Sequence, residues 1–183
     1  MTTPRRIIEA PGMRIQFLIE GHETNDSISI FRCDFEAGAR GPMPHSHDRF
    51  DNTVYGVSGT VTEVVDEVPH RLGPGDVLHV PRGVVHRTVI KEAATVLAIS
   101  TPGLFGYAYL VEMADALNAA GDGPPDRELL NAIQKRNGIT PAPASNTHIQ
   151  VEHPSPSEES AGDARHFAEP STTPSAEQER ETP

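Results

Sequence analysis

The chain has 183 residues, a formal net charge of −11 and one cysteine. Its length fits one ordinary domain with an appendage, and its acidic balance without a basic stripe argues against binding to nucleic acid or an anionic membrane. No apolar run is long enough to span a bilayer, and no hydrophobic region follows Met1-Thr2-Thr3-Pro4-Arg5-Arg6, so we expect a cytoplasmic protein without a signal peptide.

The composition changes along the chain and predicts four parts. We expect an N-terminal arm over residues 1–12, a β-barrel over 13–103, helices over 104–140 that pack on the barrel or on a partner, and a tail over 141–183. The tail is rich in Pro, Ser and Glu and has one aromatic residue, so it cannot bury enough apolar surface to offset the entropy of ordering. Residues 151–183 carry two basic and eight acidic side chains, a net of −6, which predicts a disordered acidic tail.

Short alternating stretches separated by turn residues predict an antiparallel β structure. The predicted strands are 13–20, 27–36, 54–57, 60–66, 70–72, 77–80, 84–90 and 94–100. Turns such as Gly73-Pro74-Gly75-Asp76 and Pro81-Arg82-Gly83 favour a sandwich or barrel over alternating βαβ units. Cys33 lies in one of these strands, where we expect it to act as a small buried hydrophobe, with a catalytic or cross-linked cysteine as the minority alternative.

Three histidines in this region have the spacing of metal ligands. His45 and His47 are two residues apart, so on an extended strand they project from one face about 6 to 7 Å apart. His86 follows a Pro81-x-Gly83 turn and can reach the same point from another strand. Three neutral nitrogen ligands suit zinc, iron, copper or nickel and leave positions open for water or substrate. The spacing predicts a metal site, and histidines that only hydrogen-bond are the alternative.

Both motifs resemble those of the cupin superfamily. The first cupin motif reads Gly-x5-His-x-His-x3-4-Glu-x6-Gly, and here Gly38, His45, His47 and Gly59 follow it with one extra residue after the first glycine. The second reads Gly-x5-Pro-x-Gly-x2-His-x3-Asn, and Gly75 to His86 match it. Residues 45–56 together with Phe105-Gly106-Tyr107-Ala108-Tyr109 look like bacterial quercetin-dioxygenase-like single-domain cupins. The resemblance runs from about Met13 to Pro143 and implies a jelly-roll barrel, and similar cupins are commonly dimers.

Two positions depart from these motifs in residue type, and one of them concerns an expected ligand. Asn52 stands where the first motif has its glutamate ligand, and Ile90 replaces the last asparagine of the second motif. An amide can coordinate weakly through oxygen or donate a hydrogen bond, but it cannot accept a proton at neutral pH as a carboxylate base can. We assign Asn52 as a fourth ligand or an orienting catalytic residue. The neighbouring Asp51 points to the opposite face unless a bulge intervenes, and a solvated carboxylate balancing Arg49 is its alternative role.

The hydrophobic period becomes helical after Pro102. We predict one helix over 105–119 and a second over 126–137. The second helix has Asp126 in its first turn, basic residues in its last turn, and Gly138 as a left-handed stop. The whole fold is therefore predicted to be mainly β, an antiparallel jelly-roll barrel with two C-terminal helices and a disordered acidic tail.

Other side chains could border the site. The pocket candidates are Phe50, Tyr55, His79 and Phe105. Each of them could instead have a purely structural role, since aromatic residues fill cores and a histidine on a strand often only packs against its neighbours. Arg32 and Arg40 could bind an anionic substrate group or pair with nearby Asp34 and Glu36.

The leading functional hypothesis is a metal-dependent enzyme that acts on a small organic molecule, with one divalent ion per chain held by His45, His47 and His86. The resemblance implies cleavage of a flavonol or diketone with dioxygen as the first candidate reaction, which favours iron as the metal. Zinc, nickel, manganese and copper are the other candidate metals. The alternative is a non-redox isomerase, cyclase or lyase in which the ion polarises a carbonyl. A second alternative is a ligand-binding or regulatory cupin. We expect a small-molecule substrate and a homodimer.

Overall fold

The computed structural model describes residues 5–121 and 123–143. The predicted disordered tail lies outside the described residues from position 144 onward, as do residues 1–4 of the predicted N-terminal arm.

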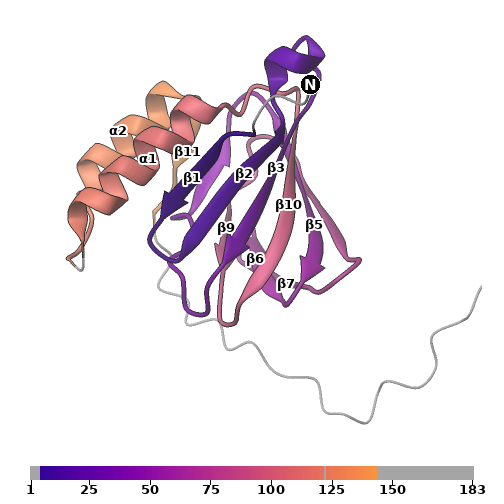
Figure 1. The fold of residues 1–183 in the computed structure, drawn as a ribbon, viewed down its shortest axis with the longest axis horizontal. Coiled ribbons are helices and arrows are strands. Elements are labelled where there is room, and N and C mark those ends of the chain that lie inside the picture. The colour runs from indigo at the N-terminus through magenta and orange to yellow at the C-terminus, as the bar shows by residue number, and fades with distance from the viewer. Residues whose placement is uncertain (1–4, 122, 144–183) are drawn as a thin grey trace, which may run out of the picture. The chain divides into compact units, whose positions relative to one another are not determined.

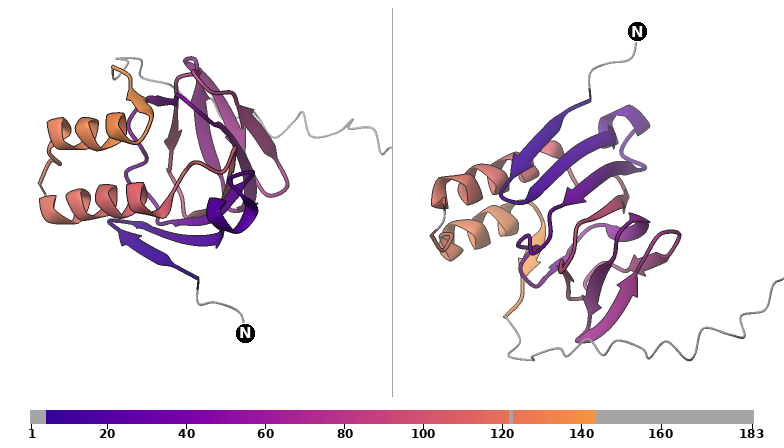
Figure 2. Two further views of the ribbon diagram at one scale, coloured as in Figure 1. Left: turned by 90° about the horizontal axis from the view of Figure 1, so that it is seen from above. Right: turned by 60° about the horizontal axis from the view of Figure 1, so that its bottom comes forward.

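Two antiparallel sheets form the body of the described chain (Figures 1 and 2). The first sheet has the order β1-β2-β3-β10-β5-β8, and the second has the order β11-β4-β9-β6-β7. The strands of the first sheet are β1 (Ile7–Ala10), β2 (Met13–Ile19), β3 (Ser29–Phe35), β10 (Ala94–Thr101), β5 (Asp51–Ser58) and β8 (Val77–Val80). Those of the second are β11 (Ile139–Pro141), β4 (His45–His47), β9 (His86–Val89), β6 (Val61–Val65) and β7 (Val68–Leu72). A short 3-10 helix, η1 (Gly21–Thr24), connects β2 to β3. The predicted mainly β jelly roll is confirmed.

The core lies between the two sheets because their strands alternate in burial. In β3, for example, Phe31, Cys33 and Phe35 are buried, whereas Arg32 and Asp34 between them are partly exposed. This is the period of two that a half-buried strand requires. Cys33 is a buried free cysteine, as the alternating pattern predicts.

Three of the strands, β1, β4 and β11, are not among the predicted strand ranges, although the spacing of His45 and His47 assumes an extended strand at β4. β1 forms within the expected N-terminal arm and pairs along β2, and β11 follows the second helix and pairs with β4. β1 has four residues and is joined to β2 by the tight turn at Pro11-Gly12. β11 has three residues and pairs with a strand from a distant part of the chain.

The two predicted helices are present as α1 (Tyr107–Ala120) and α2 (Arg127–Arg136). The Asp126 side chain caps α2 by accepting hydrogen bonds from the backbone N–H of Glu128 and Leu129, and Gly138 has a positive φ of 72° after the helix ends. The helices lie side by side, α1 against β1 and α2 against β11 (Figures 1 and 2). Within the described part of the chain, no helix has the length and apolar character needed to cross a membrane.

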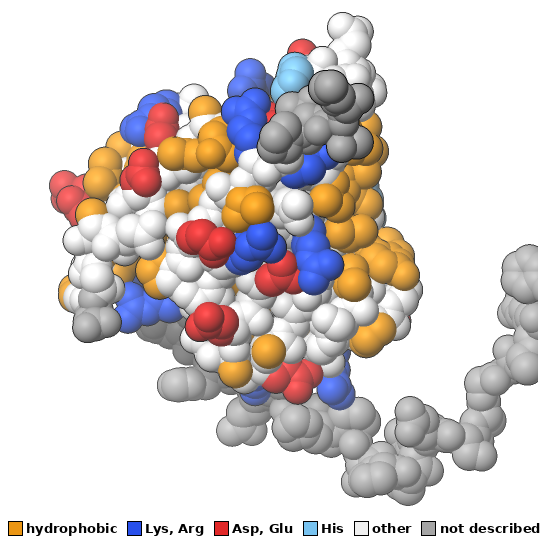
Figure 3. Space-filling view, viewed as in Figure 1, with side chains coloured by type: hydrophobic (Ala, Val, Ile, Leu, Met, Phe, Trp, Pro, Cys, Tyr) orange, Lys and Arg blue, Asp and Glu red, His pale blue; other side chains and the backbone are white. Residues whose placement is uncertain are grey.

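Charged side chains of both signs are interspersed on the face shown in Figure 3. Several of the charged side chains form ion pairs: Arg32 pairs with Asp34 at 2.7 Å and Arg14 with Glu9 at 3.2 Å. Arg32 could bind an anionic substrate group or pair with a nearby acidic residue, and the structure shows the pairing with Asp34.

Candidate metal centre

The three histidines of the two motifs come together between neighbouring strands. β4 carries His45 and His47, and the antiparallel pairing of β4 with β9 places His45 opposite His86. One ligand nitrogen of each histidine lies within 4.8 Å of the other two, and the Nε2 atoms of His45 and His47 are 3.1 Å apart. All three side chains are buried. Same-face spacing on β4 and cross-strand pairing with β9 therefore build the cluster that the motifs predict.

Backbone carbonyls fix the orientation of two of the rings. His45 Nδ1 lies 2.7 Å from the Met43 carbonyl oxygen, and His86 Nδ1 lies 3.1 Å from that of Val84. Because a carbonyl oxygen only accepts, Nδ1 of each ring carries the proton, which makes Nε2 the unprotonated nitrogen of each ring; in His45 it can accept a hydrogen bond from His47 Nε2 at 3.1 Å. A hydrogen bond of this kind is what commonly orients a metal-binding histidine.

Burial keeps the three imidazoles in the neutral form that binds metals. Burial in the apolar interior lowers the pKa of His45 to about 4 and that of His47 to about 2, and the pKa of His86 is lowered for the same reason. A neutral imidazole is the ligand form, since a protonated ring has no free lone pair. Three convergent, neutral and buried nitrogens therefore fit a divalent cation.

The histidines form one wall of an internal cavity of about 120 Å³. Phe50 and Phe105, two of the predicted pocket residues, line it. Phe50 stacks on His47 with ring centroids 4.3 Å apart, and the Phe105 ring centroid is 6.0 Å from that of His47. These rings give the cavity an apolar wall beside the ligand cluster.

Asn52 lines the same cavity from β5, at the position where the motif has its carboxylate. Asp51, its neighbour, lies on the outside and accepts hydrogen bonds from the backbone and guanidinium of Arg82. These bonds lower the pKa of Asp51 to about 2. The expected partner of Asp51 was Arg49, and the structure has Arg82 instead because the turn before β9 brings its side chain beside β5.

Two of the predicted pocket residues, Tyr55 and His79, lie elsewhere. Tyr55 is 38% exposed on the outer face of β5, one residue after the buried Val54. His79 is exposed on β8, where its Nδ1 lies 3.0 Å from the Thr53 hydroxyl. Neither lines the cavity at the histidines. The prediction was wrong for Tyr55 because the inward phase assigned to Asn52 was not extended along β5, whose inward residues are Asn52 and Val54. It was wrong for His79 because that residue pairs with Thr53, which faces outward between them.

Glu63 is a cavity residue that the sequence interpretation missed. It lies on β6, is 2% exposed and accepts a hydrogen bond of 2.7 Å from the Thr88 hydroxyl. The available signal was a charged residue inside a strand of valines. That signal was ambiguous, because Val61, Thr62 and Val64 are buried as well, so both faces of β6 are covered.

A second cavity of about 160 Å³ adjoins the first beneath the helices. The two share the side chains of Met13, Ile15, Pro42, Tyr109 and Leu110. This second cavity is almost wholly apolar in its lining and has Arg40 at one side. It provides room next to the histidine cavity for the body of a molecule larger than the first cavity holds.

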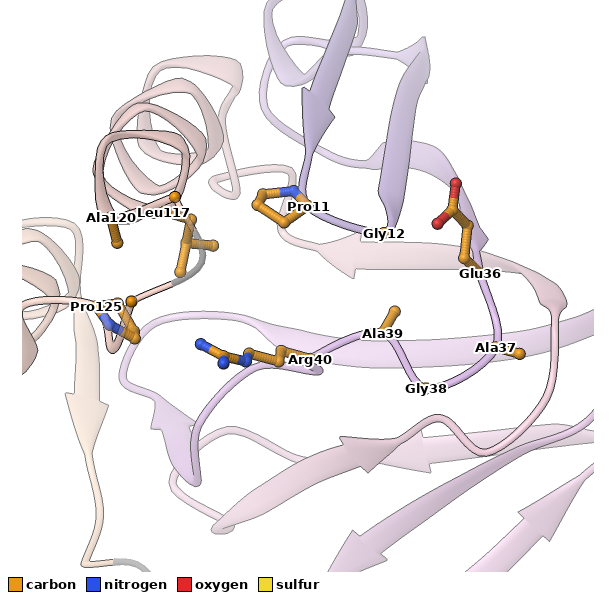
Figure 4. A pocket seen from close by; sticks show the side chains of 12 residues that line it. Pro11, Gly12, Glu36, Ala37, Gly38, Ala39, Arg40, Leu117, Ala120 and Pro125 are labelled. Carbon is orange, nitrogen blue, oxygen red and sulfur yellow. The ribbon is translucent and has the colours of Figure 1, made fainter.

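Arg40 also borders a third hollow, of about 310 Å³, at the surface (Figure 4). This hollow lies between the β1–β2 turn, the loop after β3 and the end of α1, and Glu36 is on its far side from Pro125. Figure 4 shows the Arg40 side chain extended toward Pro125 rather than toward Glu36. The hollow contains none of the three histidines and is separate from the candidate metal centre.

A jelly roll of two antiparallel sheets with three inward histidines beside an internal cavity defines a small β-barrel protein with a candidate metal centre. Residues 31–100 match the family model described as a cupin domain. This part of the chain is therefore a cupin domain, and the superfamily resemblance of the two motifs is confirmed. The finer likeness to quercetin-dioxygenase-like cupins stays a prediction.

Several solved structures are similar to the chain. KdgF from Halomonas sp. is 25% identical, with 55% of this chain and 86% of that chain covered and a TM-score of 0.47. An RmlC-like cupin from Shewanella frigidimarina is 26% identical, with coverage of 54% and 85% and a TM-score of 0.48. The polyketide cyclase RemF from Streptomyces resistomycificus is 18% identical, with coverage of 56% and 80% and a TM-score of 0.47. Among curated proteins there is no match.

Proposed function

We propose that this cupin is a metal-dependent enzyme acting on a small organic molecule, with one divalent ion held by His45, His47 and His86. The observation that carries the proposal is the convergence of three buried ligand nitrogens, all within 4.8 Å of one another, on the wall of an internal cavity. A structural metal site would be closed by a fourth protein ligand, whereas three ligands beside a cavity leave coordination positions for substrate.

Beside the ion, three side chains on the cavity wall would orient the substrate and exclude water. When bound, the ion supplies a Lewis acid that polarises a coordinated oxygen. Asn52 lies on the cavity wall and can orient a substrate atom by hydrogen bonding through either end of its amide. Phe50 and Phe105 cover the histidines with apolar surface, which keeps bulk water away and strengthens electrostatic interactions inside.

The first reaction class that we propose is cleavage of a chelating substrate with dioxygen, which requires a redox metal such as iron. A nitrogen-only ligand set is compatible with iron. The cavity of about 120 Å³ is below the range of about 300 to 1,000 Å³ typical of ligand pockets, so a diketone fits it better than a flavonol. A flavonol would have to extend into the adjoining apolar cavity.

A second candidate is a non-redox isomerase, cyclase or lyase, and Asn52 is the observation that favours it. With Asn52 at the carboxylate position, no negative charge from that residue offsets the charge of a divalent ion. Such a site is a stronger Lewis acid than one with a glutamate ligand.

Turnover measured with and without oxygen separates the two reaction classes. Protein loaded with iron and protein loaded with zinc are assayed against flavonols, diketones and hydroxyketones, with oxygen uptake and product formation followed together. Oxygen uptake coupled to product formation only with iron supports the dioxygenase. Equal turnover with zinc in the absence of oxygen contradicts it and supports the non-redox class.

The regulatory alternative makes a different prediction for the same histidines. A binding module whose histidines do not hold a metal would keep its ligand affinity in His45→Ala and His86→Ala. The proposed enzyme loses both metal and turnover in these variants. Retained ligand binding in protein that purifies without metal contradicts the proposed function.

A further inference from the structure

Glu63 is the one carboxylic acid among the residues that line the histidine cavity. It extends from β6, which lies between β7 and β9 in the second sheet. The Thr88 hydroxyl of β9 holds one of its oxygens at 2.7 Å. A buried carboxyl is costly unless something compensates for its lost hydration, and a single hydroxyl donor compensates only in part.

Strand pairing places Glu63 near the histidines without making it one of the clustered ligands. Glu63 is the cross-strand partner of Thr88, and His86 lies two residues before Thr88 on the same face of β9. Same-face residues two apart are separated by about 6 to 7 Å along a strand. The three-histidine cluster with mutual distances within 4.8 Å does not include Glu63. The carboxyl thus shares the cavity wall with the ligand cluster but is not part of the cluster.

The other titratable groups around the cavity are neutral, so burial is the main cause of the shifted pKa of Glu63. Burial raises the pKa of Glu63 to about 7, although the hydrogen bond from Thr88 opposes this shift. The other titratable residues lining the cavity are His45 and His47 of β4, His86 of β9, Cys33 of β3 and Tyr109 of α1. Burial keeps all five neutral, since it lowers the pKa values of the histidines and raises those of the thiol, to about 12, and of the phenol.

We propose that Glu63 is the acid–base residue of this cavity, exchanging a proton with a substrate bound beside His45, His47 and His86. The inference rests on the proposed function, because it needs a substrate at the metal. In the first cupin motif a carboxylate is available at the position of Asn52, and an amide cannot accept a proton there. Glu63 supplies the missing base from another strand of the barrel.

This role defines a substrate class and a balanced proton transfer. The substrate is a small molecule with an acidic O–H, or a C–H next to a carbonyl, and with oxygen atoms that can reach the ion. Ionised Glu63 takes the proton as the O–H or C–H bond breaks, and the electron pair of that bond stays on the substrate. The neutral carboxyl then returns the proton to another atom of the product, so no electrons are gained or lost overall.

Proton release on binding of a chelating probe tests this directly. Maltol, a small hydroxyketone, is titrated calorimetrically into zinc-loaded protein at about pH 8 in two buffers with different protonation enthalpies, which gives the protons released per bound maltol. At this pH free Glu63 is mostly ionised. In wild-type protein the anionic oxygen of bound maltol raises the pKa of Glu63 above its value in the maltol-free protein, so Glu63 keeps part of the hydroxyl proton and clearly fewer than one proton per maltol reaches the buffer. In Glu63→Gln, which cannot accept it, we expect about one proton per maltol to reach the buffer.

Each outcome has a distinct meaning. Glu92→Gln removes an exposed carboxyl from the β9–β10 turn and should behave as wild type. Equal proton release by wild type and Glu63→Gln, with maltol bound by both, overturns the role of Glu63 and leaves the proposed function standing. Loss of zinc from Glu63→Gln but not from Glu92→Gln also overturns it, because Glu63 would then be a ligand. Failure of zinc-loaded wild-type protein to bind maltol contradicts the open metal site itself.

Discussion

Asn52 and Glu63 give the site its charge distribution at the scale of single residues. Asn52 leaves the three-histidine cluster without a carboxylate partner at the usual motif position, and Glu63 places a carboxyl on the same cavity outside the cluster. A carboxylate bound to the ion would lower its charge, whereas one beside the substrate can accept a proton from it. Together, Asn52 and Glu63 therefore favour proton transfer, rather than binding of the ion, as the role of Glu63, the one carboxylic acid that lines the cavity.

Glu63 should make the stability of the metal-free protein depend on pH in a defined direction. Its pKa is about 7 in the folded protein, against 4.5 for an unperturbed glutamate, so the folded state keeps a proton that the unfolded state has lost between these values. The stabilisation is fully present below 4.5 and is lost as the pH rises to about 7. Above that, the ionised carboxyl costs about 3 kcal/mol.

We therefore expect Glu63→Gln to gain stability relative to wild type as the pH increases from 4.5 to 7, by about 3 kcal/mol in total. Urea denaturation of the two metal-free proteins across this range measures the difference, in which the contribution of the histidines cancels. Glu92→Gln should track wild type throughout. A difference between Glu63→Gln and wild type that does not change with pH would show that Glu63 titrates normally.

The sequence predicts the histidine cluster but cannot predict the acid beside it. His45, His47 and His86 are identifiable because a spacing of two and a glycine-rich turn fix their faces. The positions of Tyr55 on β5, His79 on β8 and Glu63 on β6 depend instead on strand phase, and β6 does not reveal its phase. In β6 four consecutive residues are buried, so alternation distinguishes no inner face.

At the scale of elements, β11 connects the helices to the candidate metal centre. Ile139 is the cross-strand partner of His47, is 1% exposed and packs in a cluster with Phe50 and Tyr109. Phe50 in turn stacks on His47. A change at Ile139 therefore reaches the site through both strand pairing and side-chain packing.

Ile139→Ala should destabilise the protein by about 2 to 5 kcal/mol, because it leaves a cavity in a well-packed cluster. Metal affinity should fall as well, since His47 loses part of its support. Leu129→Ala, in α2 and 44% exposed, should change neither property appreciably. Chemical denaturation and metal titration of both variants measure this. Unchanged metal affinity in a destabilised Ile139→Ala would show that β11 supports the fold alone.

The α2 cap is a second element-scale prediction. Asp126 accepts two backbone hydrogen bonds at the N-terminus of the helix, so Asp126→Ala should lower the free energy of unfolding by about 1 kcal/mol. Denaturant unfolding beside Glu92→Ala as the surface control measures the loss. A loss equal to that of the control would mean that the cap is frayed in solution.

The sequence predicts most of the helices and strands but not all of them. The two helices and eight of the strands follow from periodicity and turn residues, and the predicted Asp126 start and Gly138 stop of α2 are present. β11 is a short edge strand whose pairing with β4 depends on where a distant part of the chain lies, and such tertiary pairing leaves no local pattern in the sequence. β1 pairs locally with β2 across the Pro11-Gly12 turn and lies in the segment predicted to be an N-terminal arm.

At the scale of the whole molecule, the jelly roll brings two motifs from distant parts of the chain to one cavity. The histidines of β4 and β9, the amide of β5 and the carboxyl of β6 come from both sheets. The side chains are held by rigid strands, which is the arrangement that a preorganised site requires. The predicted homodimer and cytoplasmic location stay predictions.

The central claim is that the three histidines hold one divalent ion. Elemental analysis per chain, on protein purified without a metal-affinity tag, compares wild type with His47→Ala and with His70→Ala, an exposed histidine of β7. We expect about one ion per chain in wild type and His70→Ala and almost none in His47→Ala. Equal metal in all three proteins, or none in wild type after exposure to iron and zinc, would contradict the account.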